Sequence, residues 1–462
     1  GLLKEADYAS VNFGDDSTSV DYERIFYARR PILETAVKNF LANQSFQADF
    51  KSFEKNNQLW LDDFAEFMAI KEHFGNQALQ KWDDKKAVAR DPKTLEKYRT
   101  MLADQIQYFK VTQYFFFKQW SELKHYANQK GIKIIGDMPI YVAADSVEVW
   151  TKPELFQLNK ERNPLFVAGV PADQFSATGQ LWGNPLYDWE EHKKQSYAWW
   201  IHRIEESFKI YDVLRIDHFK GFSDYWQVDG KADIAKYGSW QPGPGYDLFK
   251  AVKEQLGDLP IIAEDLGNID DKARKLLADC NYPGMKILQF GFEDVSGKSL
   301  DSPHYCIPHS IVYTGTHDNE VTNGWYNGLT EQQQQYINDY THRGEDESIC
   351  QAMIRQLFAT VSNTAIATMQ DVLDLPASSR MNVPSTIGGN WQWRMQRSEL
   401  TQDKKDFLAK MTTLYQRANQ ENLMIKFSTF VKNETNKSLD QLSDKETYIQ
   451  LLNYVKTLSA DK

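Results

Sequence analysis

Six short runs of apolar, often β-branched residues recur in the second part of the chain, separated by helical or loop-rich stretches. They span residues 132–137, 213–217, 261–264, 285–290, 311–314 and 365–369. Strands that alternate with helices form a parallel sheet. Because six such units exceed what most small doubly wound domains contain, the sequence predicts an α/β fold of the (β/α)8 TIM-barrel type with insertions.

The spacing of these runs predicts three regions. Residues 1–130 read as a mostly helical subdomain inserted in the barrel, in which Asp91-Pro92 is expected to begin one helix that includes the region 102–123. One face of that region is predicted from the three-and-four spacing of Leu102, Ile106, Phe109, Phe116, Trp120 and Leu123. Residues 131–417 are expected to form the β/α barrel, with inserted loops at 138–212 and 229–250. Residues 418–462 turn polar and form a helical tail.

Composition excludes several classes of protein. The net charge of −11 argues against binding to nucleic acid, which needs basic patches. No apolar run approaches the roughly 18 residues of a membrane span. The three cysteines are too few and too scattered for a disulfide framework, which favours a cytoplasmic location. Aromatic residues are abundant, and several lie in loop-like segments such as 179–189, where rigid rings suit stacking on sugar rings.

Polar residues stand where the predicted strands end. Asp137, Asp217 and Glu264 end three of them, and Thr314-Gly-Thr-His-Asp-Asn319 follows another. In a β/α barrel the carboxyl ends converge on the face that carries the active site. Along one strand Arg215 and Asp217 share a side, so both are expected to point into the barrel mouth while Leu214 and Ile216 pack under the outer helices.

Several acids gathered at one face favour catalysis over a buried structural ion pair, because isolated buried charges are costly. Cleavage of a glycosidic bond needs one carboxyl group to protonate the leaving oxygen and one carboxylate at the anomeric carbon. A metal site near His317 is disfavoured, since no second histidine has the HxxxH spacing. The chain has no GxxxxGK[ST] phosphate loop.

Several long motifs resemble those of the 4-alpha-glucanotransferases of the amylomaltase (disproportionating enzyme) family, glycoside hydrolase family 77. They are Ile135-Gly-Asp-Met-Pro-Ile-Tyr141, Ala168-Gly-Val-Pro-Ala-Asp173, the segment 175–189, Arg215-Ile-Asp-His-Phe-Lys-Gly-Phe222, Ala263-Glu-Asp-Leu-Gly267, Tyr313-Thr-Gly-Thr-His-Asp-Asn319, Arg380-Met-Asn-Val-Pro384 and Gly389-Asn-Trp391. The resemblance extends from the start of the chain to about Arg417. It is specific because all the motifs occur together and in the same order.

The resemblance implies a role for each matching position. Asp217 matches the nucleophile, Glu264 the general acid/base and Asp318 the third carboxylate, which stabilises the oxocarbenium-like transition state. The implied substrate-binding residues are Arg215, His218 and His317 beside these acids, Asp173, Gln180, Trp182 and Asn390 along the glucan groove, and Tyr237 in a loop (237–245) on the acceptor side.

The implied reaction is a retaining transfer of a glucan segment between maltooligosaccharides, with glucose among the products and acceptors. Retention predicts that the two main carboxyl groups lie roughly 5 Å apart. No cofactor and no metal are expected. A hydrolase of the α-amylase clan would use the same acids, and a non-catalytic glucan-binding protein is the alternative from another class.

The sequence departs from the family at both ends. The family has two further barrel strands before the segment that resembles Gly1-Leu-Leu-Lys-Glu-Ala-Asp7. We therefore expect either that the sequence begins part-way through the natural protein or that the fold is completed in another way. Beyond Arg417, the segment 424–432 resembles the opening of a bacterial maltodextrin phosphorylase. The alternative for this tail is a polar helical extension.

Overall fold

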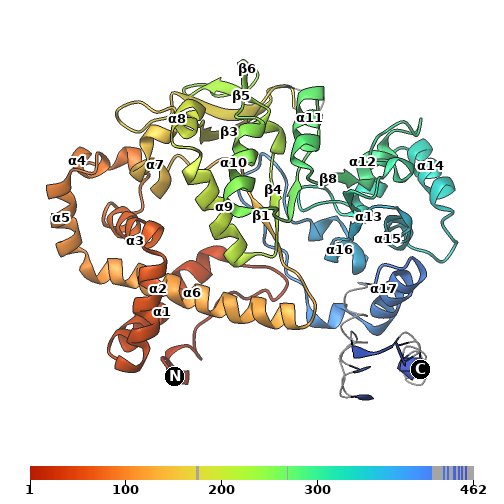
Figure 1. Cartoon of the computed structure of the whole chain (residues 1–462), viewed down its shortest axis with the longest axis horizontal. Coiled ribbons are helices and arrows are strands. Elements are labelled where there is room, and N and C mark those ends of the chain that lie inside the picture. The colour runs from red at the N-terminus through yellow and green to blue at the C-terminus, as the bar shows by residue number, and fades with distance from the viewer. Residues whose placement is uncertain are drawn as a thin grey trace.

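The computed structural model describes residues 1–172, 176–267 and 269–418, together with short pieces between 430 and 454. Figure 1 shows helices α1–α6 on one side, parallel strands in the centre and helices α12–α17 on the other side. The predicted tail at 418–462 lies largely outside the described residues. Among those that are described, no helix is both long and apolar enough to cross a membrane.

The N-terminal region is helical, as predicted. Its helices are α1 (Tyr22–Leu41), α2 (Gln47–Asn56), α3 (Gln58–His73), α4 (Lys85–Val88), α5 (Pro92–Met101) and α6 (Ala103–Gln129). A helix does start at Asp91-Pro92, because the Asp91 side chain caps α5 by accepting a hydrogen bond from the backbone N–H of Thr94 at 2.9 Å. The prediction of one continuous helix is wrong, since α5 ends at Met101 and the residues from Ala103 on form a separate helix, α6.

The predicted apolar face of α6 is only partly right. Leu102 and Phe109 are buried, but Phe116 and Leu123 are 46% and 53% exposed. The first half of α6 packs between other helices and buries Tyr108, Val111 and Tyr114 as well. The second half has fewer helices around it, so the three-and-four spacing there does not correspond to a covered face.

Six parallel strands form the centre of the molecule, and each predicted strand is present. They are β1 (Ile135–Met138), β4 (Val213–Ile216), β7 (Ile261–Ala263), β8 (Gly284–Ile287), β9 (Ser310–Tyr313) and β10 (Thr364–Ile366). The hydrogen-bonded order is β1-β4-β7 and β8-β9-β10. A bond from Ala263 N–H to Pro283 O at 3.0 Å joins the two groups, so β1 and β10 end the series.

Five of the six strands are shorter than predicted, all except β9. β1 begins at Ile135 rather than at residue 132, β4 and β7 each end one residue early, and the runs at 285–290 and 365–369 end in helices. Leu288 already begins helix α12 (Leu288–Glu293), and Met369 begins α16 (Met369–Val372). Apolar runs of this length do not distinguish a strand from the buried first turn of a helix, which explains the error.

An antiparallel sheet covers the carboxyl ends of the first strands, at the top of Figure 1. Its order is β3-β2-β5-β6, from β2 (Phe166–Val170), β3 (Gln180–Pro185), β5 (Asp224–Asp229) and β6 (Gly238–Pro242). β2 and β3 lie in the predicted insertion at 138–212 and β6 in that at 229–250, whereas β5 lies almost wholly before the second predicted insertion. Because β5 follows β4 after one short 3₁₀ turn (Phe219–Phe222), this sheet forms a wall beside the barrel mouth.

The remaining helices surround the strands. They are α7 (Val147–Thr151), α8 (Trp189–Lys194), α9 (Ala198–Ile210), α10 (Tyr246–Leu256), α11 (Asp271–Cys280), α13 (Thr322–Asn327), α14 (Glu331–Thr341), α15 (Ile349–Ala359) and α17 (Gln402–Leu414). The largest core cluster joins the N-terminal helices to β1 and β4, so these two regions share one core.

Strand β4 shows the predicted division of its side chains. Leu214 and Ile216 are fully buried in the same cluster as Trp200 and Ile204 of α9. Arg215 points to the other side, where its Nε donates to the sulfur of Met285 at 3.4 Å. The apolar residues therefore hold the strand against its helix, and the charged residues face the barrel interior.

Gly136 lets β1 approach the chain that enters β4. A Cβ atom at this position would lie 2.0 Å from the ring of Tyr211. We expect Gly136→Ala to lower the free energy of unfolding by about 1–3 kcal/mol, as overpacked core substitutions do. Denaturant unfolding measures this. Gly328→Ala is the matched control, since its nearest neighbours would be 3.4 Å or more away, and an equal loss in both variants would contradict the prediction.

Candidate active site

The strand ends bring the predicted acids together. Parallel register pairs Asp137 with Arg215, and the backbone N–H of Asp217 donates to Met138 O at 3.0 Å. Glu264 follows β7 directly, and its N–H donates to Ile216 O at 3.0 Å. Three neighbouring strands thus place Asp137, Asp217 and Glu264 at one end of the barrel.

Arg215 links two of these carboxylates. Its side chain is only 9% exposed, and Nη1 donates to Oδ1 of Asp137 at 2.6 Å and to Oδ1 of Asp217 at 2.9 Å. Burial alone would lower the pKa of Arg215, but the charges of Asp137 and Asp217 outweigh it and raise that pKa. A permanently charged guanidinium therefore holds the Asp217 carboxyl group in place.

Glu264, unlike Asp217, lies in an environment that favours its protonated form. Its two carboxyl oxygens accept backbone N–H bonds from His218 and Leu266, each at 2.8 Å. Burial nevertheless raises the pKa of Glu264 to about 7, and the negative charge of Asp217 adds to this effect. Glu264 can therefore hold a proton, while the neighbouring Asp217 is paired with an arginine. Two carboxyl groups with such different environments can act as an acid and a nucleophile.

Asp318 lies in the loop after β9 and is fixed from two sides. Oδ1 accepts a bond from the amide of Asn382 at 2.6 Å, and Oδ2 lies 3.3 Å from Nε2 of His317. Burial would raise the pKa of Asp318, but the bonds from His317 and Asn382 outweigh burial and lower it. The bond to Asp318 in turn raises the pKa of His317. Asp318 is therefore an anion at neutral pH.

His218 stands where the chain leaves β4. It has a left-handed backbone with φ of +50°, which turns its N–H toward Glu264. Its ring meets that of Trp182 edge-on, with centroids 4.8 Å apart. Burial lowers the pKa of His218 to about 4, so the imidazole is neutral at pH 7. Trp182 donates from Nε1 to Oε1 of Gln180 at 3.3 Å, and both residues belong to β3.

The other predicted binding residues are spread around the mouth. Asn390 accepts from the backbone of Val383, in the loop that carries Asn382. Tyr237 is 72% exposed and directly precedes β6. Asp173 lies outside the described residues, so its placement is not known.

Three residues of this site have no role that the sequence implied. Asp137 is one of the strand-end acids of the sequence, but its bond to Arg215 depends on register across two strands. Asn382 and Trp391 lie in matched motifs, yet only the folded loop puts Asn382 on Asp318 and the Trp391 ring 5.1 Å from that of His317. Polar residues inside a motif are the signal that could have identified Asn382.

The Asn382 amide helps to keep Asp318 ionised, which leads to a pH prediction. Asn382→Ala removes a donor that lowers the Asp318 pKa. The acidic limb of the pH profile of kcat/KM should therefore move to higher pH. At neutral pH we expect kcat/KM of the variant to be about tenfold lower than that of the wild type. Asn128→Ala removes a comparable amide bond, to Asp212 at 2.9 Å on the α6 side of the sheet, and should leave the profile unchanged. An unmoved acidic limb in Asn382→Ala would refute this role.

A cavity of about 280 Å³ adjoins these acids between β1 and β10. Asp137, Arg215, Tyr313, His317 and Thr368 line it. Of the acids only Asp137 lines this cavity, but the side chains of Asp137, Asp217 and Asp318 are 42%, 43% and 43% exposed. These three acids therefore face open space rather than a packed core, as catalytic groups require.

Comparison with known proteins agrees with this geometry. Residues 1–402 match the family described as 4-alpha-glucanotransferase, glycoside hydrolase family 77. The 4-alpha-glucanotransferase of Streptococcus pneumoniae is 52% identical over 425 residues, which are 92% of this chain and 84% of that protein. That of Clostridium butyricum is 42% identical, over 90% of this chain and 85% of that protein.

A solved structure extends the comparison to the fold. The amylomaltase from Streptococcus agalactiae, solved in complex with acarbose, superposes with a TM-score of 0.89 at 56% identity, covering 90% of this chain and 84% of that one. This likeness confirms the predicted TIM-barrel type of α/β fold. The chain belongs to the 4-alpha-glucanotransferase family, glycoside hydrolase family 77.

Proposed function

We propose that Asp217, Glu264 and Asp318 transfer a segment of an α-1,4-glucan to the 4-hydroxyl of glucose or another maltooligosaccharide by a retaining double displacement. The observation that carries this assignment is the contrast between two neighbouring acids. Arg215 pairs with Asp217, while burial raises the pKa of Glu264 to about 7.

In the first half of the reaction the bond between the anomeric carbon and the leaving oxygen breaks. An Asp217 oxygen attacks the anomeric carbon, and the Glu264 proton passes to the leaving oxygen. The glucosyl group becomes bound to Asp217 as an ester, and Glu264 is left as a carboxylate. Its two backbone N–H partners, from His218 and Leu266, then hold the anion in position.

In the second half the 4-hydroxyl of an acceptor sugar takes the place of water. Glu264 removes its proton, the oxygen attacks the anomeric carbon, and Asp217 leaves as a carboxylate paired with Arg215. Two inversions give net retention, so the two carboxyl groups are expected roughly 5 Å apart. Asp318, fixed by His317 and Asn382, supplies negative charge for the oxocarbenium-like transition state.

Sugar binding is assigned to the residues around the acids. Trp182 offers an aromatic face at the mouth, where it is 36% exposed and contacts His218. Gln180, His317 and Asn390 supply polar groups near the same groove, and Tyr237 stands on the acceptor side. The implied part of Asp173 stays a prediction.

The division into a helical subdomain at 1–130, a barrel at 131–417 and a tail from 418 also stays a prediction. So does the cytoplasmic location, which is compatible with three cysteines that are all free. No cofactor or metal enters the proposed reaction, since every proton and electron pair is carried by the acids and the sugars.

Incubation with maltotriose tests the proposed function. Transfer produces glucose together with a ladder of products longer than maltotriose, which chromatography or mass spectrometry resolves. Shortening of maltotriose with no longer product would indicate hydrolysis instead. A protein that binds maltotriose without converting it would indicate a glucan-binding protein.

A further inference from the structure

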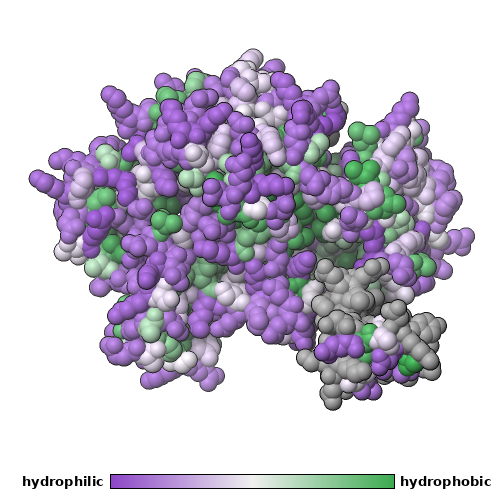
Figure 2. All heavy atoms as spheres, viewed as in Figure 1, coloured by the Kyte–Doolittle hydropathy of each residue, from purple (hydrophilic) through white to green (hydrophobic). Residues whose placement is uncertain are grey.

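A second concave site lies between the N-terminal helices and the barrel. We call it the α3–α9 cleft, after the helices on its two sides, with α6 and α7 completing it. Its cavity measures about 410 Å³, within the range of ligand pockets, about 300–1,000 Å³. Hydrophilic residues cover most of the face drawn in Figure 2, and hydrophobic atoms show mainly in its recesses.

One wall of the cleft is aromatic. Trp60 and Phe64 of α3 have ring centroids 6.1 Å apart, and Trp60 lies 5.6 Å from Phe117 of α6. Phe116 is 46% exposed beside them. Large rings are usually buried, so rings that face a cavity from two helices offer a ready stacking surface.

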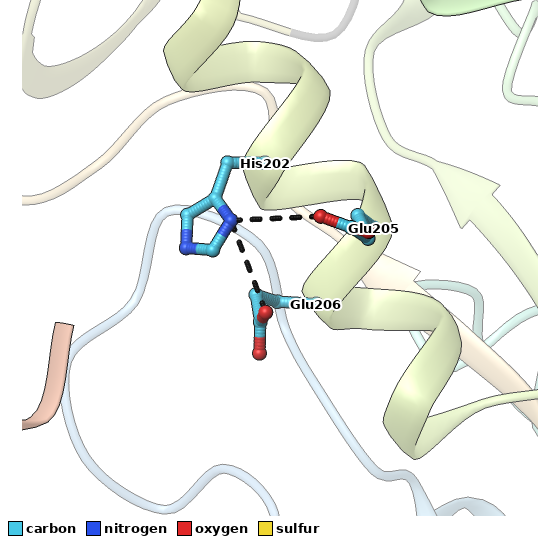
Figure 3. Close-up of side chains that lie close together, drawn as sticks. All are labelled: His202, Glu205 and Glu206. Atoms are coloured by element: carbon cyan, nitrogen blue, oxygen red, sulfur yellow. Dashed lines mark ion pairs between the residues drawn. The ribbon is translucent and has the colours of Figure 1, made fainter. Parts of the chain in front are cut away.

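The opposite wall is polar and comes mainly from α9. His202, Arg203 and Glu206 line the cleft there, with Glu148 of α7 nearby. In Figure 3 the glutamates at 205 and 206 both flank one nitrogen of His202, Nδ1, each at 3.8 Å. The other nitrogen points away from both and has no hydrogen-bond partner among the described residues.

These three side chains could also hold a metal ion, because their ligand atoms lie within 4.8 Å of one another. Two observations weigh against that use. Glu205 is more than half exposed, and Glu206 already forms an ion pair with Lys209 of the same helix. The carboxylates are better explained as groups that orient His202.

Arg203 shows how the cleft relates to the active site. Its guanidinium donates to Pro139 O at 2.7 Å and Ile140 O at 3.1 Å, in the segment that directly follows β1. Arg203 approaches this segment from α9, whereas Asp137 of the same strand faces Arg215 in the barrel. The cleft is therefore a separate site from the catalytic mouth, on the helix side of the same strand.

An aromatic wall opposite a polar wall matches the two kinds of surface on a sugar. The apolar face of a pyranose ring can stack on Trp60 and Phe117, and its hydroxyls can bond to His202, Glu206 and Glu148. A purely apolar ligand would leave those polar groups unpaired, which costs about 1–3 kcal/mol for each buried group. The lining carries three carboxylates, Asp63, Glu148 and Glu206, against two cations, Lys152 and Arg203, which does not favour an anionic ligand.

We infer that the α3–α9 cleft is a second, non-catalytic binding site for an α-1,4-glucan segment. This inference rests on the proposed function for the class of ligand, but not on the roles of the three acids.

The test counts binding sites by isothermal titration calorimetry of the full chain with maltoheptaose. Asp217→Asn is the background, so that the ligand is not converted. We expect two classes of site in Asp217→Asn and only one in Asp217→Asn combined with Trp60→Ala, with the cleft affinity weakened at least about tenfold. Tyr126→Ala is the matched aromatic control, since Tyr126 lies on α6, is 60% exposed and does not line the cleft.

The polar wall has its own matched pair. Glu206→Gln should weaken binding at the second class of site, and Glu254→Gln, a surface glutamate of α10 outside the cleft lining, should not. A single class of site in Asp217→Asn, or two classes that survive Trp60→Ala, would overturn the inference. Conversion of maltotriose by the Trp60→Ala chain with Asp217 intact reports on the proposed function separately and should be unchanged.

Discussion

Replacement of Asp217 by asparagine is expected to lower kcat/KM for maltotriose disproportionation by about 10⁴-fold or more, as loss of a catalytic nucleophile does in other enzymes. The amide is nearly the same shape, but it cannot form the ester with the anomeric carbon. It also loses the charge that pairs with Arg215 at 2.9 Å. Initial rates of glucose release from maltotriose measure the effect.

Two comparisons separate loss of chemistry from loss of structure. Asp247→Asn removes an exposed carboxylate that pairs with Lys193 at 2.8 Å, and its rate should stay near that of the wild type. Asp217→Asn should still bind maltooligosaccharides, because the aromatic and polar groups of the groove remain. If Asp217→Asn retained a tenth or more of the activity, the assignment of the nucleophile would be wrong.

Glu264→Gln should lower the rate with maltotriose by about 10²–10⁴-fold, the usual contribution of a general acid. Glutamine cannot protonate the leaving sugar oxygen. With α-glucosyl fluoride as donor the loss should be much smaller in the first step, because fluoride leaves without being protonated. Initial rates with both donors check this, and Glu254→Gln, which alters a surface pair with Lys250, is the control.

Glu264 also determines the pH dependence of kcat/KM. Burial raises the pKa of Glu264 to about 7, so the acid form dominates below that pH and is lost above it. In the wild type kcat/KM for maltotriose should therefore fall above about pH 7, by about tenfold per unit. The alkaline limb should be absent from Glu264→Gln. A wild-type profile that stays flat to pH 9 would contradict the role of Glu264.

Prediction from sequence worked best where a pattern is local. The six strands and the Asp91 cap depend on residues close together in the chain, and the structure contains all of them. Prediction failed where contacts with residues distant in sequence decide whether a side chain is buried or where a strand ends. Phe116 and Leu123 fit an apolar helix face, yet about half of each side chain is exposed, and Leu288 continues an apolar run but begins a helix.

The sequence by itself determined the order of strands and helices, the direction of Arg215 and Asp217 on β4, and the family. Alternation of side chains is a property of the strand, so the sequence contains it. Only the tertiary structure decided how the acids differ. Asp217 and Glu264 are both carboxylates at strand ends, but one receives the Arg215 guanidinium and the other lies in a buried position beside a negative charge. A pKa depends on burial and on neighbouring charges across strands, and those exist only once the barrel has formed.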